Sequence, residues 1–328
     1  MPVKISAVIP THNGSLFLEE TLNGLLLQTS PVHEVIIVDD GSTDNTSQII
    51  EHFTTKLPIK AFYRTHCGNW VSNTNFGLAQ AVGDYVSILH QDDVWLPDRI
   101  KILTDILHAH PATNMILHPS MFIDMNGKRL GIWCCPFGRK QRAIESAEIL
   151  DKLIVQNFIS MPAPLISRKA LEKNGGLDEE LWFTADWKLW LGLARLGKWI
   201  YHPVPLTCFR VHENSQTIQG GQSIECYAEQ IRRVQHPLLD TFASRKIRAL
   251  ATFNTEVNQA LLHVLFSLPY PWVRLLLRFI KLRPTAWLDF FSFSRLHERL
   301  IARLRLRKNL IRTRRSMIES GDSLSRDQ

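Results

Sequence analysis

The sequence lacks the glycine-rich phosphate loops that mark two large classes of nucleotide-binding protein. Its 328 residues contain neither the GxGxxG pattern of dinucleotide-binding oxidoreductases nor the GxxxxGK[ST] pattern of P-loop proteins. In P-loop proteins the glycine-rich loop presents backbone N–H groups to the phosphates. The absence of both patterns disfavours dinucleotide oxidoreductase and P-loop chemistry.

Cysteine is scarce, and its spacing defines no site. The five cysteines are an odd number without a paired framework. Two of them, Cys134 and Cys135, are adjacent, which does not fit the spacing of a zinc site. A reducing cytosol fits this usage best.

Long hydrophobic runs are missing as well. No uninterrupted apolar stretch reaches the roughly 18 residues of a membrane-spanning helix, because Arg274, Arg278 and Lys281 interrupt the best candidate. The N-terminus enters a strand-like run at once, without the charged region, long apolar region and cleavage site of a signal peptide. We therefore expect a cytoplasmic protein, soluble or peripheral on the inner face of the cell membrane.

Acidic residues are rare near the C-terminus. The net charge is +7 and the pI about 9.2. Between Val264 and Arg315, thirteen Lys and Arg residues stand against only Asp289 and Glu298. No basic and aromatic pattern of a known nucleic-acid-binding module accompanies this charge, so nucleic acid is not expected as a partner.

Short apolar runs alternate with segments of helical spacing in the first hundred residues, in a chain whose 45% hydrophobic content is typical of a globular protein. We expect strands at 5–10, 35–38, 59–63 and 85–89, and helices at 17–28, around 49–53 and at 69–81. This alternation predicts an α/β fold with a mostly parallel sheet flanked by helices. The loops after the first, second and fourth strands would converge on one edge of the sheet.

The pattern changes after a helix that begins at Pro97. A hairpin is expected from 115–123 and 129–133, with its turn at Asn126-Gly127. Later expected elements are helices at 146–156, 169–174 and 186–196 and strands at 164–167, 199–202 and 206–210. From about Gln222 the spacing is helical almost to the end. These patterns predict an α/β domain over residues 1–215 and a basic helical extension over residues 216–328.

Two adjacent carboxylates follow the strand expected at 85–89. Asp92 and Asp93 stand at its carboxyl end, before Pro97 opens a helix. In open α/β sheets, ligands bind in the crevice beyond the carboxyl ends of the strands. Two oxygen donors there can hold Mg²⁺, which takes one or two carboxylates together with substrate phosphates. The same pair also suits the N-terminal cap of a helix, and both interpretations stay open.

A second pair, Asp39-Asp40, ends the strand expected at 35–38 and again precedes a helix. Capping explains one such pair more easily than two at neighbouring strands. Crowded like charges repel unless a cation or hydrogen-bond donors offset them. A nucleobase N–H and ribose hydroxyls are suitable donors, so Asp39 or Asp40 can contact a nucleotide while Asp92 holds a metal ion.

Five ordered motifs resemble those of a known family. They are VIPTHN at 8–13, VDDGSTD at 38–44, QDDVWLPDR at 91–99, FTADWKLW at 183–190 and RVHENS at 210–215. Together they resemble the motifs of inverting family 2 glycosyltransferases with the GT-A fold, over roughly residues 3–215. Five motifs in family order are far more specific than any one of them.

The resemblance implies a role for each matching residue. Asp186 would be the general base for an acceptor hydroxyl, and Asp92 would coordinate Mn²⁺ or Mg²⁺, with His212 near the metal or the diphosphate. Thr11 and His12 would border the nucleobase of the donor. The family usually has a Tyr that stacks on the nucleobase at the position of His12. The implied nucleotide-sugar contacts are Pro10, Thr11, His12, Asn13, Asp39, Asp40, Gln91, Asp93 and Arg210.

Two positions depart from the family pattern. His90 stands where many members have the first Asp of a DxD motif, and Ala185 stands where many have Glu before the base. An imidazole suits softer cations than a carboxylate does, so His90 can alter the metal preference. His12 and His212 can also be ordinary loop histidines, and Trp187, Trp190 and Trp199 are expected in the core because aromatics at helical spacing usually pack.

The resemblance implies metal-assisted transfer of a sugar, with inversion, from a nucleoside diphosphate donor to an acceptor hydroxyl. The acceptor would be a saccharide, a lipid-linked glycan or a protein, in cell envelope polysaccharide or glycan synthesis. Two alternatives stay open. One is a nucleotide-sugar-binding protein without turnover, and the other is a nucleotidyltransferase that makes the activated sugar.

The C-terminal segment carries a basic amphipathic pattern. Leu296, Leu300, Leu304 and Ile311 recur at helical spacing beside arginines, and Trp272 belongs to an apolar and aromatic stretch before them. A helix of this kind can lie on an anionic membrane surface. The alternative is a helical tail packed on the catalytic domain or on another subunit.

Overall fold

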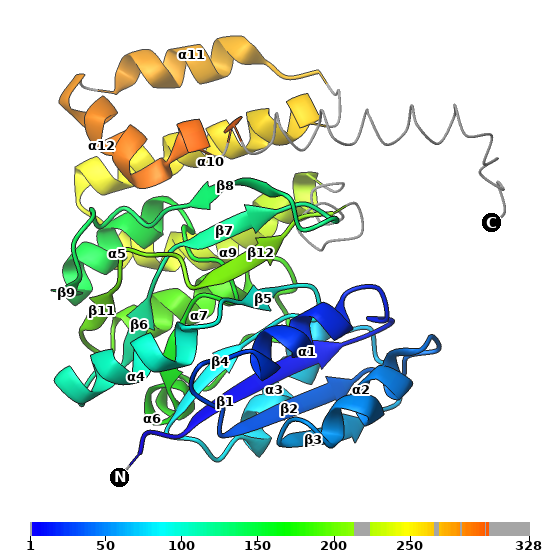
Figure 1. Cartoon of the computed structure of the whole chain (residues 1–328). Helices are drawn as coiled ribbons and strands as arrows, with labels where there is room; N and C mark the ends of the chain where they lie inside the picture. The colour runs from blue at the N-terminus through cyan, green and yellow to red at the C-terminus, as the bar shows by residue number, and fades with distance from the viewer. Residues whose placement is uncertain (1, 213–223, 266–268, 283, 299, 302–328) are drawn as a thin grey trace, which may run out of the picture.

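The computed structural model describes residues 2–212, 224–265, 269–282, 284–298 and 300–301. In Figure 1 the first strands and helices, in blue and cyan, form one end of the molecule, and the helices of residues 245–294 are stacked at the other. The predicted domain boundary at residue 215 lies outside the described residues, as does most of the basic helix predicted from Leu296 to Ile311.

The centre of the molecule is an eight-stranded sheet. In spatial order its strands are β3 (Ile59–Tyr63), β2 (Glu34–Asp39), β1 (Ile5–Thr11), β4 (Tyr85–Ile88), β10 (Leu165–Ser167), β6 (Met115–Leu117), β11 (Trp199–Tyr201) and β9 (Arg142–Ile144). β1 pairs in parallel with β2 and β4, β2 with β3, and β6 with β11. β10 and β9 join as antiparallel strands. The predicted α/β fold is confirmed.

A second sheet of four short strands lies beside the site. Its order is β5 (Val94–Trp95), β12 (Thr207–Arg210), β7 (Ser120–Ile123) and β8 (Arg129–Trp133). β7 and β8 form the predicted hairpin, and Gly127 in its turn has a φ of +74°, which favours glycine. The strand expected over 115–123 is instead two strands, because His118 and Pro119 break it between the two sheets. β5 and β9 were not expected.

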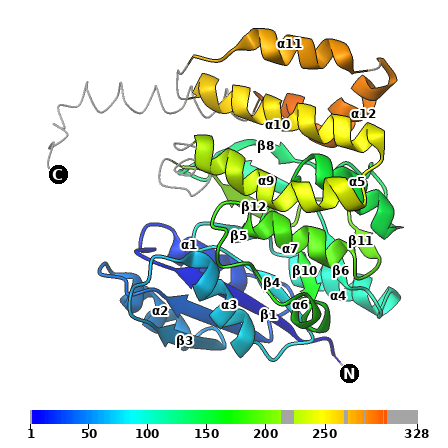
Figure 2. The same ribbon diagram turned by 180° about the vertical axis from the view of Figure 1, so that it is seen from behind.

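Helices cover both faces of the large sheet (Figures 1 and 2). They include α1 (Leu18–Leu26), α2 (Thr46–Thr54), α3 (Trp70–Gln80), α4 (Arg99–Ala109), α5 (Ser146–Val155), α6 (Arg168–Asn174), α7 (Ala185–Ala194) and α9 (Ile224–Thr241). Farther from the sheet, α10 (Arg245–Leu265) packs on α5 and α9, and α11 (Trp272–Lys281) and α12 (Pro284–Ser294) pack on α10. In the part of the chain that the structure describes, no helix is long and apolar enough to cross a bilayer.

Side chains of β1 alternate between two hydrophobic clusters. Ala7 and Ile9 belong to the cluster that contains residues of α1, α2 and α4, whereas Val8 belongs to the cluster with α3, α5, α7, α9 and α10. Because both faces of the strand are covered, β1 reads as a continuous apolar run. Trp187, Trp190 and Trp199 are buried in the second cluster, as predicted.

The start and the packing of α3 follow from two residues. Asn69 caps the helix, because its side-chain oxygen accepts hydrogen bonds from the N–H groups of Val71 and Ser72 at 3.0 and 3.2 Å. Gly77 lets the helix lie directly on β1 and β2, since a Cβ there would be 2.6 Å from Cγ1 of Val8. This close approach supports the strand ends that carry the site.

Replacing Gly77 with alanine tests this close packing. Alanine normally favours a helix, but here its Cβ overlaps Val8, so we expect Gly77→Ala to lower the free energy of unfolding by about 1–3 kcal/mol. Ser72→Ala, at a partly exposed position of the same helix, should change it by less than about 0.5 kcal/mol. Urea denaturation of both variants measures the difference, and equal stability of the two would contradict the packing argument.

Candidate active site

A cavity of about 580 Å³ opens beyond the carboxyl ends of β1, β2 and β4. Its lining includes these residues from the predicted motifs: Pro10, Thr11, His12, Asn13, Asp40, Gln91, Asp92, Asp186 and Arg210. Asp39, Asp93 and His212 are absent from the described lining. The loops after the first, second and fourth strands therefore converge on one site, as we predicted from the expected parallel sheet.

Gln91 ties two of these loops together. Its Oε1 accepts hydrogen bonds from the Thr11 hydroxyl at 2.5 Å and from the His12 backbone N–H at 2.8 Å, while its Nε2 donates to the His12 carbonyl at 3.1 Å. Asn13 is held by the next loop, because its backbone N–H donates to the hydroxyl of Ser42 at 2.8 Å. The loops after β1, β2 and β4 thus form one connected rim.

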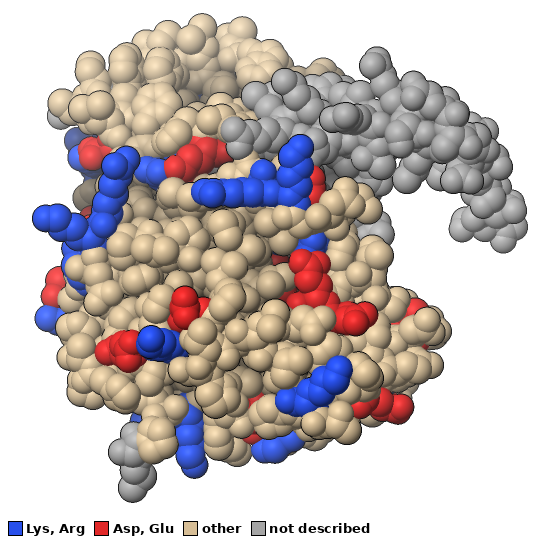
Figure 3. Space-filling view, viewed as in Figure 1, with Lys and Arg blue, Asp and Glu red and all other residues tan. Residues whose placement is uncertain are grey.

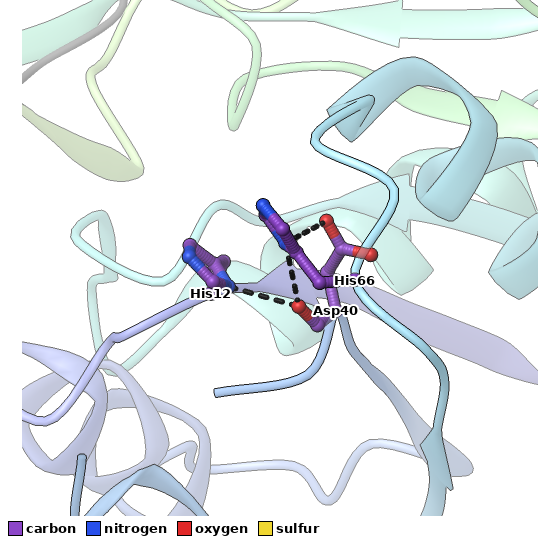
Figure 4. Close-up of side chains that lie close together, drawn as sticks. All are labelled: His12, Asp40 and His66. Carbon is purple, nitrogen blue, oxygen red and sulfur yellow. Dashed lines mark hydrogen bonds and ion pairs between the residues drawn. The ribbon is translucent and has the colours of Figure 1, made fainter. Parts of the chain in front are cut away.

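Asp40 lies at the centre of a cluster with two histidines (Figure 4). Nδ1 of His12 and Nδ1 of His66 lie 2.9 and 3.0 Å from its backbone carbonyl, and the two rings stack with centroids 4.3 Å apart. Its carboxylate accepts the N–H groups of Cys67 and Gly68, both at 2.9 Å. Burial alone raises the pKa of Asp40, but these hydrogen bonds outweigh burial and leave the pKa lowered. Asp40 is therefore ionised at neutral pH.

Asp39 has a different position from its neighbour. It is buried, and its carboxylate accepts hydrogen bonds from the backbone N–H and the hydroxyl of Ser42. This arrangement holds the turn that begins the segment before α2. The predicted nucleotide contact of Asp39 stays a prediction.

Asp92 and its neighbours form the second acidic part of the site. Nε2 of His212 lies 2.9 Å from Oδ2 of Asp92, whose side chain is 19% exposed. Asp93 is fully buried and accepts the backbone N–H of Arg210 at 2.9 Å. Burial, together with the charge of Asp92, raises the pKa of Asp93 well above its usual range. Of the pair Asp92 and Asp93, only Asp92 is in the described lining of the cavity.

Arg210 holds the loop of Asp92 through buried hydrogen bonds. Its guanidinium is buried and donates to the backbone carbonyls of Asp92 at 2.8 Å and Asp124 at 3.0 Å, and it pairs with Glu20 at 2.5 Å. It also lies over the ring of Phe17, 4.7 Å from the centroid. These contacts give Arg210 a structural task at the site. Contact with a diphosphate stays a prediction.

The donor atoms around Asp92 fit a divalent cation. One ligand atom from each of His90, Asp92 and Asp93 lies within 4.8 Å of the others. Nε2 of His90 is buried and has no hydrogen-bond partner among the described residues, and burial lowers the pKa of this imidazole, which keeps it neutral. A neutral imidazole beside the Asp92 carboxylate suits Mn²⁺ as well as the oxygen-preferring Mg²⁺.

Asp186 lines the same cavity, from the first turn of α7. Burial raises its pKa from 3.8 to about 6, although hydrogen bonds from Asn157 and from the Trp187 N–H act in the opposite direction. A carboxylate with this pKa is ionised at neutral pH and can accept a proton from a hydroxyl. The position and the pKa both suit a general base.

Several residues of the site were not predicted from sequence. His66 follows β3, the third strand, whose polar loop ends at the same sheet edge and was a usable signal. Asn157 follows α5, and Tyr227 and Asn258 reach the cavity from α9 and α10. No local pattern marks these three, because only the packing of distant segments brings them to the site.

Sequence comparison relates the chain to known proteins. Over residues 6–175 the chain matches the profile of glycosyl transferase family 2. An uncharacterized glycosyltransferase of Rickettsia typhi is 28% identical over 227 residues, which are 68% of this chain and 69% of that protein. The poly(ribitol-phosphate) beta-N-acetylglucosaminyltransferase TarS of Staphylococcus aureus is 32% identical over 118 residues, which are 35% of this chain and 21% of TarS.

Solved structures show the same fold. Residues 1–349 of S. aureus TarS in complex with UDP-GlcNAc match with a TM-score of 0.67 and 21% identity, over 89% of this chain and 81% of that one. In another TarS crystal structure, the chain corresponds to 43% of the length. The fold is that of the GT-A glycosyltransferases. The chain belongs to glycosyl transferase family 2, which confirms the family indicated by its sequence motifs. The matched region contains the first three of the five motifs.

The raised pKa of Asp186 predicts a pH dependence of stability. The folded state binds the proton of the Asp186 carboxyl group more tightly than the unfolded state does. The free energy of unfolding therefore falls progressively as the pH rises from about 4 to about 6, and changes little above that range. The free energy of unfolding of Asp186→Asn should therefore rise, relative to that of wild type, by on the order of 2 kcal/mol across that interval. Urea denaturation at a series of pH values measures this difference.

Asp178 offers a matched control. Its ion pair with Lys188 lowers its pKa, so Asp178→Asn should lose stability relative to wild type, and only as the pH rises through the acid range below about 4. A flat difference between wild type and Asp186→Asn from pH 4 to pH 7 would mean that Asp186 titrates normally.

Proposed function

We propose that the protein transfers a sugar from a nucleoside diphosphate sugar to an acceptor hydroxyl with inversion at the anomeric carbon, assisted by a divalent metal ion. One observation carries this proposal: Asp40, Asp92 and Asp186 line a single cavity. They suit, respectively, a nucleotide, the diphosphate with its metal and the acceptor. The proposed catalytic residue is Asp186.

The donor side supports a nucleotide with several hydrogen-bonding groups. Asp40 is ionised and can accept N–H or hydroxyl groups, and the stacked rings of His12 and His66 offer a flat surface to a base. TarS, which shares the fold, has been crystallised with UDP-GlcNAc and with UDP. A uridine diphosphate sugar is therefore the first donor to test.

The reaction needs one base and one leaving group. Asp186 would accept the proton of the acceptor hydroxyl while the hydroxyl oxygen bonds to the anomeric carbon and the bond from that carbon to the diphosphate oxygen breaks. Asp92, with His90 and His212 beside it, would hold Mn²⁺ or Mg²⁺, which supplies positive charge to the departing diphosphate. A direct displacement of this kind inverts the configuration.

The acceptor side is lined by aromatic and amide side chains. Trp133, Trp182, Phe209 and Tyr227 line the cavity, together with Asn258. Flat aromatic surfaces with amide hydrogen-bonding groups suit a saccharide, free, lipid-linked or attached to protein. We propose a role in the synthesis of a cell envelope polysaccharide or a related glycan.

Two other functions predict different products. A binding protein without turnover would bind the nucleotide sugar and leave it intact, whereas a nucleotidyltransferase would release pyrophosphate from a nucleoside triphosphate and a sugar phosphate. His90 and Ala185 favour neither function over transfer, because Asp92 and Asp186 both line the cavity.

Release of nucleoside diphosphate tests the proposal. We expect wild type to release it from one of a panel of sugar donors with Mn²⁺ or Mg²⁺, and to lose this activity with a chelator. Asp92→Asn should lose about 10²-fold or more because the metal loses a charged ligand, and Asp186→Asn should lose a similar factor because the base is gone.

Asp178→Asn, at a partly exposed position, serves as the matched control and should keep the wild-type rate. Metal-independent release, or activity that survives both Asp92→Asn and Asp186→Asn, would refute the assigned roles. Intact donor after incubation with the whole acceptor panel would favour the binding protein.

We also propose that the C-terminal helices contact an anionic membrane surface, peripheral on the inner face of the cell membrane. One face of α11 exposes Trp272, Val273, Leu276, Leu277 and Ile280, each more than half exposed. Its last turn carries Arg278 and Lys281. In Figure 3 the region of α11 is covered almost wholly by uncharged side chains. Apolar anchors beside basic residues suit anionic lipid.

Flotation of the full-length protein with vesicles tests this contact. We expect binding to phosphatidylglycerol vesicles that weakens with salt, and a loss of about tenfold or more in Leu276→Glu/Ile280→Glu, because each buried side chain contributes about 1.5–3 kcal/mol. Val82→Glu/Val204→Glu, at two exposed sites elsewhere, should bind like wild type. A dimer through α11 with no vesicle binding would refute the proposal.

A further inference from the structure

The side chain of Asn157 contacts the carboxylate of Asp186. Its Nδ2 donates to Oδ2 of Asp186 at 2.9 Å, and its Oδ1 accepts the backbone N–H of Ile159 at 3.1 Å. The second bond determines which end of the amide faces Asp186, since only the oxygen can accept an N–H. Asn157 therefore presents a donor to the base in a fixed orientation.

The residue before Asn157 is held by α10. Gln156 donates through Nε2 to the Asn157 carbonyl at 2.7 Å, and its Oε1 accepts from Nδ2 of Asn254 at 2.8 Å and from Nδ2 of Asn258 at 3.1 Å. Asn254 also donates to the Val155 carbonyl at 2.7 Å, at the end of α5. The three amide side chains are buried. Hydrogen bonds thus link α10 through Gln156 to the backbone of Asn157, whose side chain contacts Asp186.

The segment that carries Asp186 is held by α9. Oε1 of Gln230 accepts the backbone N–H groups of Phe183 at 2.9 Å and Thr184 at 3.3 Å, just before α7 begins. Gln230 is 5% exposed. Figure 2 shows α9 and α10 side by side over α5 and α7. Two C-terminal helices therefore hold both the base and its hydrogen-bond partner.

Neutral amides suit such a task. An unsatisfied buried amide costs about 1–3 kcal/mol, so each of these groups strongly favours the one arrangement that satisfies it. A salt bridge at the same place would add a charge near Asp186 and shift its pKa, whereas amides fix geometry without adding a charge. The titratable groups that line the same cavity include His90, Asp92 and Tyr227.

We propose that Asn157 is the positioning residue of the base Asp186 and that α9 and α10, through Gln230, Gln156 and Asn254, hold this pair in its working geometry. The C-terminal helices are then part of the catalytic machinery as well as a surface for other contacts. This inference rests on the proposed function, in which Asp186 accepts the proton of the acceptor.

The test compares kcat, KM for the donor and the pH profile of full-length variants. Asn157→Ala removes the hydrogen-bond donor to the ionised carboxylate and so raises its pKa. The acid limb of the pH profile of kcat should therefore move to higher pH by about one unit. We expect kcat above that limb to fall about 10- to 100-fold through lost orientation, with KM for the donor changed by less than about threefold. Asn157→Ser, which keeps a donor, should restore part of both losses.

Variants of the distant amides separate positioning from general support. Asn254→Leu removes the side chain that holds Gln156, and should shift the limb and lower kcat in the same direction by a smaller factor. Gln235→Leu removes an equally buried amide of α9, which donates to the Ile154 carbonyl one residue earlier in α5. It should lower the melting temperature without moving the limb.

A readout without turnover keeps this inference separate from the proposed function. The pKa of Asp186, measured by carboxyl ¹³C NMR with Asp186→Asn as the assignment control, should rise in Asn157→Ala whether or not a donor is consumed. An unchanged pKa and acid limb in Asn157→Ala would overturn the inference. An equal shift of the Asp186 pKa in Gln235→Leu and Asn254→Leu would overturn the proposed positioning role of α10. No donor consumption by wild type would count against the proposed function alone.

Discussion

The site depends on the parallel pairing of β1 with β2 and β4. The register places Thr11 opposite Asp39, and the backbone N–H of Asp40 donates to the Thr11 carbonyl at 2.9 Å. On the other side, the N–H of Leu89 donates to the Val8 carbonyl at 2.9 Å, just before the Asp92 loop. Since parallel strands end at a common edge, three polar loops meet there. A slip of one residue would turn each side chain to the opposite face.

Burial gives the carboxylates of this site different properties. Asp40 accepts several backbone hydrogen bonds that lower its pKa, so it stays charged. At Asp186, desolvation by burial outweighs the hydrogen bonds from Asn157 and from the Trp187 N–H, so its pKa is raised to about 6. Carboxylates whose environments separate their pKa values can take different tasks in one reaction. The proposed nucleotide contact of Asp40 and the proposed proton transfer at Asp186 follow this separation.

The sequence predicted the first half of the fold and the sheet edge at which the cavity opens, because that information is local. Continuous apolar runs marked β1, β2 and β4, and polar motifs followed them directly. β5 and β9 have two and three residues and no clear alternation, so they were missed. Asn157 could not be predicted, since its contact with Asp186 depends on how α5 and α7 pack. The helical C-terminal extension was predicted, but its position was left open between a membrane surface and packing on the catalytic domain. In the structure α10 packs on α5 and reaches the cavity through Asn258.

The stereochemistry of donor cleavage tests the central claim most directly. If Asp186 activates the incoming hydroxyl for a single displacement, slow hydrolysis of an α-linked nucleoside diphosphate sugar should release the β-anomer first, since water then takes the place of the acceptor. Proton NMR of the anomeric signals distinguishes the two anomers before they equilibrate. Initial release of the β-anomer would agree with one base and inversion. Initial release of the α-anomer would contradict it, because retention requires a nucleophile on the protein or an attack from the leaving-group side.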